Sequence, residues 1–359
     1  MGLFRKKELC CGCGACMDIC PKKAITMVKD CEGFRYPRVN GQICIKCGRC
    51  EQVCPIKHDE SFKNKNLYLG VQAKEDKIRY SGSSGGFFSV LVQYVMKRKG
   101  IVYGAGYDER MHVLHREIEE PAHLKSIKRT KYVQSNMEGI YRRIKRNLQE
   151  NRWVLFSGTP CQADALMRFL NQKYEKLIVV DLICYGVPSP GIWEDYVKYL
   201  ERRHGGRMTD FSFRDKRNGD NGHMRSYIIN GKEYADSLSQ DIYCKMYFKN
   251  YILRPSCYKC RFCTVNRRSD FTIGDFWGIG RIRPDMDDGM GTSAVIIHSE
   301  LGKEVWKEIK SELRWFACGK EDILQPRLSE PTMPNKGRRG FMMLYKVVPF
   351  RIMVKLLER

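Results

Sequence analysis

Apolar and polar positions between residues 67 and 203 alternate in a way that predicts strands and helices in turn. Four short apolar runs have the length of buried strands and occupy residues 67–73, 101–107, 153–157 and 177–184. Segments with helical spacing of apolar residues follow at 87–99, at 163–174 and from Gly191 onward. We therefore expect an α/β domain here, within a chain that is α+β overall.

Two cysteines lie at the carboxyl ends of the last two predicted strands. Cys161 lies in the predicted turn 158–162, and Cys184 closes the run 177–184. Consecutive parallel strands joined by helices place their carboxyl ends at one edge of the sheet, where open α/β sheets bind ligands. The two thiols are therefore expected at the same edge.

A Gly/Ser loop, Ser81-Gly-Ser-Ser-Gly-Gly86, leads directly into the helix predicted at 87–99. Such a loop leaves backbone N–H groups free at the positive end of the helix dipole, which suits a phosphate. A flexible helix cap is the alternative.

The first sixty residues contain two copies of the spacing C-x2-C-x2-C-x3-C, each followed by proline. The cysteines of the two copies are Cys10, Cys13, Cys16 and Cys20, and then Cys44, Cys47, Cys50 and Cys54. In bacterial two-cluster ferredoxins the fourth cysteine of each run binds the other cluster. We therefore expect Cys54 to complete the first 4Fe–4S cluster and Cys20 to complete the second. Zinc, the alternative, prefers two separated cysteine pairs.

A third group, Cys257, Cys260 and Cys263, has three quarters of the same spacing and lacks the offset fourth cysteine. A third cluster would need a ligand from elsewhere, and Cys161 and Cys184 are both candidates. A zinc site built from these five cysteines is the alternative.

The remaining cysteines and the histidines receive no ligand role. Cys11 and Cys31 are interpreted as packing or spare thiols, and Cys244 and Cys318, in helical patterns, as core residues. The seven histidines form no spaced pair.

The net charge is +23, and the basic residues are dispersed, with two local concentrations at residues 125–146 and 336–359. No helix-turn-helix, zinc-finger or RNA-binding signature accompanies it, so we do not expect nucleic acid as a partner. The basic tail 340–359 is amphipathic and is interrupted by Pro349. We expect a helix docked on the protein body, with contact to an anionic membrane surface as the alternative.

The 17 cysteines are consistent with a reducing, cytoplasmic compartment. The chain starts without the apolar core and cleavage site of a secretory signal. It also contains no run of about 20 apolar residues that would form a membrane helix. In such a compartment, grouped cysteines bind metal or do chemistry.

Several strings between residues 67 and 299 make the chain resemble the beta subunit family of coenzyme F420 hydrogenases and dehydrogenases, in a form fused to a ferredoxin. The strings are Ser83-Ser-Gly-Gly86, Thr130-Lys-Tyr-Val-Gln-Ser135, Gly158-Thr-Pro-Cys-Gln162, Cys184-Tyr-Gly-Val-Pro-Ser189, Arg254-Pro-Ser-Cys-Tyr-Lys-Cys260 and Ser269-Asp-Phe-Thr-Ile-Gly-Asp-Phe-Trp-Gly278.

The resemblance implies an FAD-binding domain with its own 4Fe–4S cluster. The implied cluster ligands are Cys161, Cys184, Cys257 and Cys260, and Cys263 has no counterpart and is kept as a reserve ligand. The implied flavin contacts are Ser84, Gly85, Gly86, Lys131 and Tyr132, which agrees with the phosphate loop inferred from the sequence. Lys131 would stabilise reduced flavin, and Asp275 would shape the pocket or cap a turn.

Four segments are expected. They are a two-cluster ferredoxin domain (1–60), two parts of the beta-subunit domain (67–150 with the flavin loop, 151–320 with the third cluster) and a basic tail (321–359), with a linker at 61–66.

The predicted function is electron transfer from a redox partner or small donor through the clusters to FAD and an organic two-electron substrate such as a deazaflavin, in either direction. The alternative is an electron-transfer subunit without substrate chemistry that docks on a larger enzyme. The sequence specifies neither the substrate, nor the catalytic residues, nor the oligomeric state.

Overall fold

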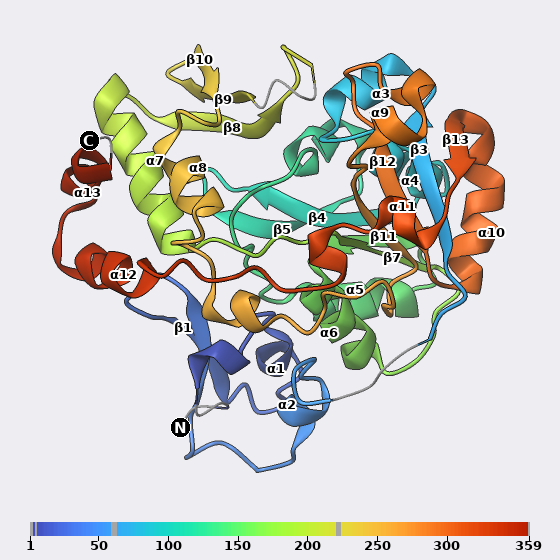
Figure 1. The fold of residues 1–359 in the computed structure, drawn as a ribbon. Helices are drawn as coiled ribbons and strands as arrows, with labels where there is room; N and C mark the ends of the chain where they lie inside the picture. The colour runs from blue at the N-terminus through green and yellow to red at the C-terminus, as the bar shows by residue number, and fades with distance from the viewer. Residues whose placement is uncertain (1–2, 4–5, 59–62, 220–223, 358–359) are drawn as a thin grey trace.

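The computed structural model describes residues 3, 6–58, 63–219 and 224–357. An eight-stranded mixed sheet lies at its centre, in the order β13-β3-β12-β11-β7-β6-β4-β5 (Figure 1). Its strands are β3 (Leu67–Ala73), β4 (Ile101–Tyr107), β5 (Val113–Ile118), β6 (Val154–Gly158), β7 (Leu177–Leu182), β11 (Phe271–Asp275), β12 (Ser293–Ile297) and β13 (Leu313–Ala317). The α/β fold class expected from the sequence is confirmed.

Strand direction brings the expected loops to one edge of this sheet. β4, β6, β7 and β11 pair in parallel. β12 is antiparallel to both β11 and β3, so β3 runs in the same direction as the parallel strands. The carboxyl ends of all five parallel strands therefore meet at the same edge.

Helices cover both faces of the sheet because successive side chains of a strand point to opposite faces. The covering helices are α4 (Phe87–Lys97), α5 (Ile140–Gln149), α6 (Pro160–Leu170) and α10 (Glu300–Ile309). Leu155 of β6 packs in one apolar cluster with α4 and α10. Phe156, the next residue, packs in another cluster with α5 and α6. The body is thus a three-layer sandwich (Figure 1).

The N-terminal module folds as a repeat of two similar halves. Its elements are α1 (Ala15–Asp18), β1 (Ile25–Lys29), β2 (Arg35–Val39) and α2 (Arg49–Gln52). β1 and β2 form an antiparallel pair, and α1 contacts α2. Gly14 and Gly48, which precede the two helices, both adopt left-handed conformations, with φ of 80° and 73°. The repeated cysteine spacing thus produces a repeated turn that favours glycine.

The module is tied to the body at the N-terminus of α5. The buried Asp18 carboxylate accepts hydrogen bonds from the backbone N–H groups of Gly139 (2.9 Å) and Tyr141 (3.2 Å). The Tyr141 hydroxyl in turn donates to the carbonyl of Cys13 at 3.0 Å. Asp18 therefore caps α5 from a different part of the chain, where a negative charge is favoured by the helix dipole.

A third group of elements packs beside the sheet around its own apolar cluster. It contains α7 (Pro190–His204), β8 (Met208–Asp215), β9 (Met224–Ile229), β10 (Lys232–Ser237), α8 (Ile242–Phe248), α12 (Arg338–Val347) and α13 (Phe350–Leu357). The basic tail forms α12 and α13, separated at Pro349, and α13 contacts α7. The tail is docked on the body, as expected. The short helices α3 (Asp76–Ser81), α9 (Ile279–Ile282) and α11 (Lys320–Ile323) complete the described α-helices.

Two local predictions differ from the structure. α6 begins at Pro160, not at residue 163, because Thr159 and Gln162 form a capping box, so Cys161 lies in the first helical turn. Cys318 follows β13 and is not helical. The predicted linker 61–66 lies partly outside the described residues, as does the end of the segment 1–60. No helix in the described ranges is both long and apolar enough to span a membrane.

Candidate iron–sulfur and flavin sites

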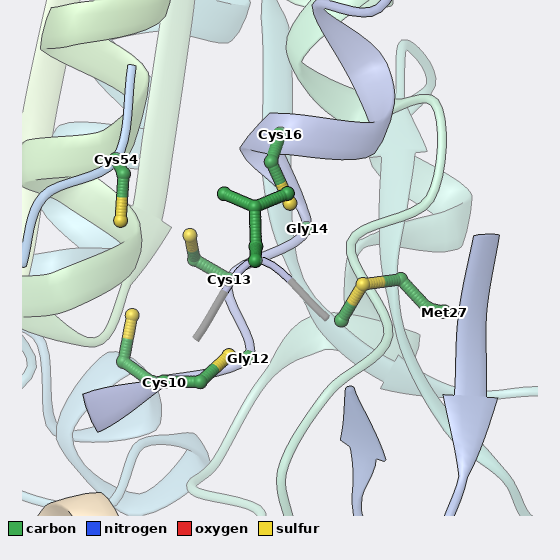
Figure 2. A pocket seen from close by; sticks show the side chains of 9 residues that line it. Cys10, Gly12, Cys13, Gly14, Cys16, Met27 and Cys54 are labelled. Atoms are coloured by element: carbon green, nitrogen blue, oxygen red, sulfur yellow. The ribbon is translucent and has the colours of Figure 1, made fainter. Parts of the chain in front are cut away.

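The first predicted cluster site is a small cavity lined by thiols. Cys10, Cys13, Cys16 and Cys54 line it together with Cys11 and the two neighbouring glycines. Figure 2 shows the side chains of Cys10, Cys13 and Cys54 directed toward a shared space. All four predicted ligands are buried. The structure thus places Cys54, the last cysteine of the second run, beside the first three cysteines of the first run. This is the arrangement expected when the fourth cysteine of each run binds the other cluster.

The chemistry of this lining fits an iron–sulfur cluster. The described residues that line the cavity include no histidine or carboxylate, and soft thiolates select zinc, copper(I) or iron–sulfur clusters. Gly12 (φ 70°) and Gly14 have left-handed conformations, which leave a backbone free to wrap closely round a cluster. Burial is the main cause that raises the pKa of Cys54 and Cys16, so thiolates here need a positive partner such as iron.

The second predicted site lies nearer the surface. Burial is the largest cause that raises the pKa of Cys50, followed by the nearby carboxylate of Glu51. Cys44 and Cys47 also lie close enough to Cys50 to raise its pKa. Cys47 is exposed, and Cys20, Cys44 and Cys50 are half-buried. The Cys20 sulfur accepts a hydrogen bond from the backbone N–H of Ala24 (3.3 Å). α1 ends just before Cys20 and contacts α2, which contains Cys50.

The third group of thiols gathers from three distant parts of the chain. Cys184 is affected electrostatically by Cys161 and Cys260, and Cys257 by Cys184, Cys260 and Cys161. Burial is the largest cause that raises the pKa of Cys184, to about 12. All four cysteines implied by the family resemblance therefore lie together at the carboxyl edge of the sheet.

Cys263 belongs to the same group. Interaction with Cys263 is the largest cause that lowers the pKa of Cys260, to about 7. The same interaction raises the pKa of Cys263. Cys263 also lies within electrostatic reach of Cys184. Five thiols thus lie together in this group. Within the described ranges, no three His, Cys, Asp or Glu side chains are placed to hold a single metal ion.

Cys11, interpreted from the sequence as a packing or spare thiol, lies between the first and third groups. Its thiol lies close enough to Cys13 and Cys161 to perturb the pKa of both, and the three residues pack in one apolar cluster. The sequence contains no signal for this position, because Cys11 is outside the repeated spacing and Cys161 is 150 residues away. In contrast, Cys31 is exposed and Cys244 is buried in the core.

The two segments predicted to contact flavin lie side by side. The Ser83 hydroxyl accepts a hydrogen bond from the backbone N–H of Thr130 (2.8 Å), which precedes Lys131 and Tyr132. Ser84 donates to the carbonyl of Thr292 at 3.1 Å. A Cβ atom on Gly85 would lie 2.2 Å from the carbonyl of Val71, so only glycine fits there.

The buried N-terminus of α4 carries no side-chain cap. Gly86, the residue before the helix, has φ of 90°, and both Gly86 and Phe87 are buried. The first N–H groups of a helix lack partners within the helix, so a buried end without a cap favours an external acceptor. This geometry fits an anion such as a phosphate.

Lys131 is a half-buried lysine whose hydrogen-bond acceptors among the described residues are backbone carbonyls. Its ammonium contacts the carbonyls of Lys128 (2.5 Å), Arg129 (3.1 Å) and Ser126 (3.3 Å). Burial lowers the pKa of Lys131 to about 7, and Asp210 only partly opposes this effect. A negative group nearby would therefore favour its charged form.

Aromatic rings connect Tyr132 with the third thiol group. Tyr132 packs against Tyr247, with ring centroids 5.0 Å apart, and Tyr247 packs edge-on against Tyr185 at 5.4 Å. Tyr185 directly follows Cys184, and Tyr247 lies within electrostatic reach of Cys184. Asp275 ends β11 and forms an ion pair with Arg214 at 2.7 Å.

A polar cavity of about 320 Å³ lies beside the first and third thiol groups. Its lining includes Pro55, which follows Cys54, and Pro160, which precedes Cys161. Ion pairs of Arg267 with Asp181 (2.7 Å) and of Arg168 with Asp164 (2.7 Å) account for much of its charge.

Comparisons with known proteins agree with these observations. Residues 151–316 match the family model for the C terminus of the coenzyme F420 hydrogenase/dehydrogenase beta subunit. Residues 9–58 match the model of the 4Fe-4S dicluster domain. No curated protein matches the chain. Thirteen chains of solved structures match.

One of these chains comes from the xenon-derivatised F420-reducing NiFe hydrogenase complex of Methanosarcina barkeri. It is 14% identical, with a TM-score of 0.46, and the match covers 83% of the present chain and 94% of that chain. Residues 151–316 are thus similar to the C-terminal domain of the coenzyme F420 hydrogenase/dehydrogenase beta subunit, and residues 9–58 form a 4Fe-4S dicluster domain of the kind that transfers electrons in iron–sulfur proteins.

Proposed function

We propose that this protein is an iron–sulfur flavoprotein oxidoreductase in which three 4Fe–4S clusters connect a redox partner with FAD and an organic two-electron substrate. The proposed inner cluster is held by Cys161, Cys184, Cys257 and Cys260, with Cys263 in reserve. The cysteines of the N-terminal module hold the other two clusters. The direction of electron flow depends on the partner and the substrate.

The position of Cys11 is the observation that carries this proposal. It packs in one apolar cluster with Cys13 of the first group and Cys161 of the third, close enough for the thiols to perturb one another's pKa. The protein therefore contains a continuous series of thiols from the N-terminal module to the carboxyl edge of the sheet. Such contact has no evident purpose for a ferredoxin module that acts independently of the body.

The exposure of the thiols supports an order of the three groups along the proposed electron route. Cys47 of the second group is exposed, whereas all four thiols of the first group are buried. Ile43 and Ile45, next to Cys44, are 46% and 56% exposed. The second group is therefore the side that a redox partner approaches, the first is intermediate, and the third is innermost.

The body supplies features suited to FAD. The uncapped, buried N-terminus of α4 would accept its phosphates, and Lys131 would place a positive charge beside them or beside the ring. Tyr132, Tyr247 and Tyr185 fill the space between this region and Cys184, which excludes water from the route.

This combination matches the chemistry of two-electron reduction. When bound, iron–sulfur clusters pass electrons singly, and a flavin collects two and delivers them together. The protein's own residues would position these groups and supply charge. The N–H groups at the start of α4 and the ammonium of Lys131 would bind the negative charge of the cofactor. The carboxyl end of β3, next to Gly85, would fix the position of the cofactor.

Flavin quantitation tests the proposal. The protein should be purified without oxygen, the clusters removed with acid, and the absorbance of the released fraction measured. We expect about one flavin per chain. A protein that contains its full iron but no flavin, and that does not bind added FAD, would instead be an electron-transfer subunit without substrate chemistry.

A further inference from the structure

Arg254 is a buried cation at the boundary between the N-terminal module and the body. Its side chain is 1% exposed. Nε donates to the carbonyl of Cys10 at 2.7 Å, and Nη2 donates to the carbonyl of Arg35 at 2.9 Å and lies 3.7 Å from the Cys10 sulfur. Nη1 donates to Oε1 of Gln134 at 2.9 Å. The guanidinium is therefore fixed against the loop of the first thiol group.

No carboxylate balances this charge among the described residues that contact it. Every acceptor of Arg254 there is a carbonyl, an amide oxygen or a cysteine sulfur. The guanidinium carbon also lies 4.2 Å from the ring centre of Tyr36, over an aromatic face. A charge buried without a partner costs several kcal/mol, so a compensating negative charge is expected nearby. The sulfurs of Cys10 and Cys257 are in reach and would supply negative charge as thiolate ligands of a cluster.

Gly12 is shaped to admit the guanidinium. A Cβ atom at this position would lie 2.6 Å from Nη1 and 2.7 Å from Cζ of Arg254. It would also lie 2.8 Å from Nε2 of Gln134, which donates to the carbonyl of Cys11 at 2.9 Å. The cluster loop therefore closes round Arg254, and its residues leave room for this side chain.

We propose that Arg254 is a positioning residue that holds the loop of the first cluster and sets its reduction potential. A cubane held by four thiolates carries net negative charge and gains one more on reduction. Its potential depends on local charge and on hydrogen bonds near its sulfurs. A fixed positive charge beside Cys10 therefore favours the reduced form. Arg254 also lies three residues before Cys257, so it stands between the first and third thiol groups.

A redox titration monitored by electron paramagnetic resonance tests this inference on the full chain, purified without oxygen. In Arg254→Gln, the ratio of reduced to oxidised first cluster at a fixed potential should fall at least tenfold, which corresponds to 59 mV for one electron. Arg254→Lys keeps the charge and should shift the ratio less. Arg38→Gln removes an exposed charge of the same module and should leave the ratio within twofold.

Gln134→Glu provides a second variant with the same side-chain shape. Its carboxylate would neutralise Arg254 in place, so the ratio should fall in the same direction as in Arg254→Gln. Iron content shows that each variant retains its clusters. An unchanged ratio in a variant with full iron would overturn the inference. Loss of iron from both variants would also overturn it, because Arg254 would then be needed to assemble the cluster and not to set its potential. The inference rests on the proposed cluster at Cys10 and not on FAD, so flavin content tests the proposed function separately.

Discussion

Cys161, in the first turn of α6, packs in one apolar cluster with Cys11 of the N-terminal module, and each thiol perturbs the pKa of the other. This contact connects two parts of the chain that are 150 residues apart in sequence. It places the thiols of the N-terminal module and those of the body in one series. Within this series Cys161 is a proposed cluster ligand, whereas Cys11 is a neighbour of ligands.

Serine variants of these two cysteines should behave differently. Cys161→Ser removes a proposed ligand and should lower the iron content by about four atoms per chain. Cys11→Ser should retain the wild-type iron, because Cys11 completes neither of the N-terminal clusters. Iron and sulfide quantitation of both variants measures this. Equal losses would mean that Cys11 is itself a ligand.

The flavin affinity should depend on pH through Lys131. Burial lowers the pKa of Lys131 to about 7, and a bound anion would favour its charged form. Below pH 7 the amine is already charged. Above pH 7 it must take up a proton on binding, so the affinity for FAD should fall by up to about tenfold per pH unit. Fluorescence titration between pH 6 and 9 measures this.

Lys131→Gln serves as the matched variant for this prediction. It cannot be charged, so its FAD affinity should be weaker at pH 6 and nearly constant up to pH 9. A wild-type affinity that is equally flat would place Lys131 away from the flavin. The exposed Lys125, in the same basic segment, offers a control, and Lys125→Gln should bind like wild type.

The capping of α5 by Asp18 should contribute to stability. Asp18→Ala leaves the N–H groups of Gly139 and Tyr141 without their acceptor and should cost about 1–2 kcal/mol in the free energy of unfolding. Denaturant titration measures this cost. Glu150→Gln, at the exposed far end of α5, should change stability by less than about 0.5 kcal/mol. Similar effects of the two substitutions would contradict a capping role for Asp18.

His115 should make the protein less stable in acid. Its imidazole packs on Phe156 with ring centroids 5.4 Å apart, and burial lowers its pKa to about 4. The ordinary value is about 6.5, so between pH 6.5 and 4 the unfolded chain binds a proton that the folded protein does not. Stability should therefore fall as the pH falls through this window, by roughly 3 kcal/mol from this group.

The comparison for His115 is His115→Gln, which cannot take up the proton. Its stability should decline less between pH 6.5 and 4 than that of wild type, as measured by denaturant titration at each pH. Parallel declines would show that other groups account for the acid sensitivity, among them the buried His298, whose pKa burial lowers to about 3.

Local patterns in the sequence predicted much of this fold. The strands β3, β4, β6 and β7 were expected within two residues of their observed ends because buried strands are short apolar runs. The spacing of the two cysteine runs predicted the gathering of Cys10, Cys13, Cys16 and Cys54, because a tight loop imposes the geometry of its ligands.

Contacts between distant segments could not be predicted in this way. Cys11, Asp18 and Arg254 each act on residues more than 100 positions away, and no spacing marks their partners. These positions are determined by how the module packs on α5 and the sheet edge. The boundary of α6 was missed for a local reason, since Pro160 favours the first turn of a helix and was assigned to a turn.

The central claim is that the thiols of the body hold a third cluster in series with the two of the N-terminal module. Iron and sulfide quantitation of the full chain, purified without oxygen, tests it most directly. The account predicts about twelve iron and twelve sulfide per chain, whereas about eight of each would contradict it.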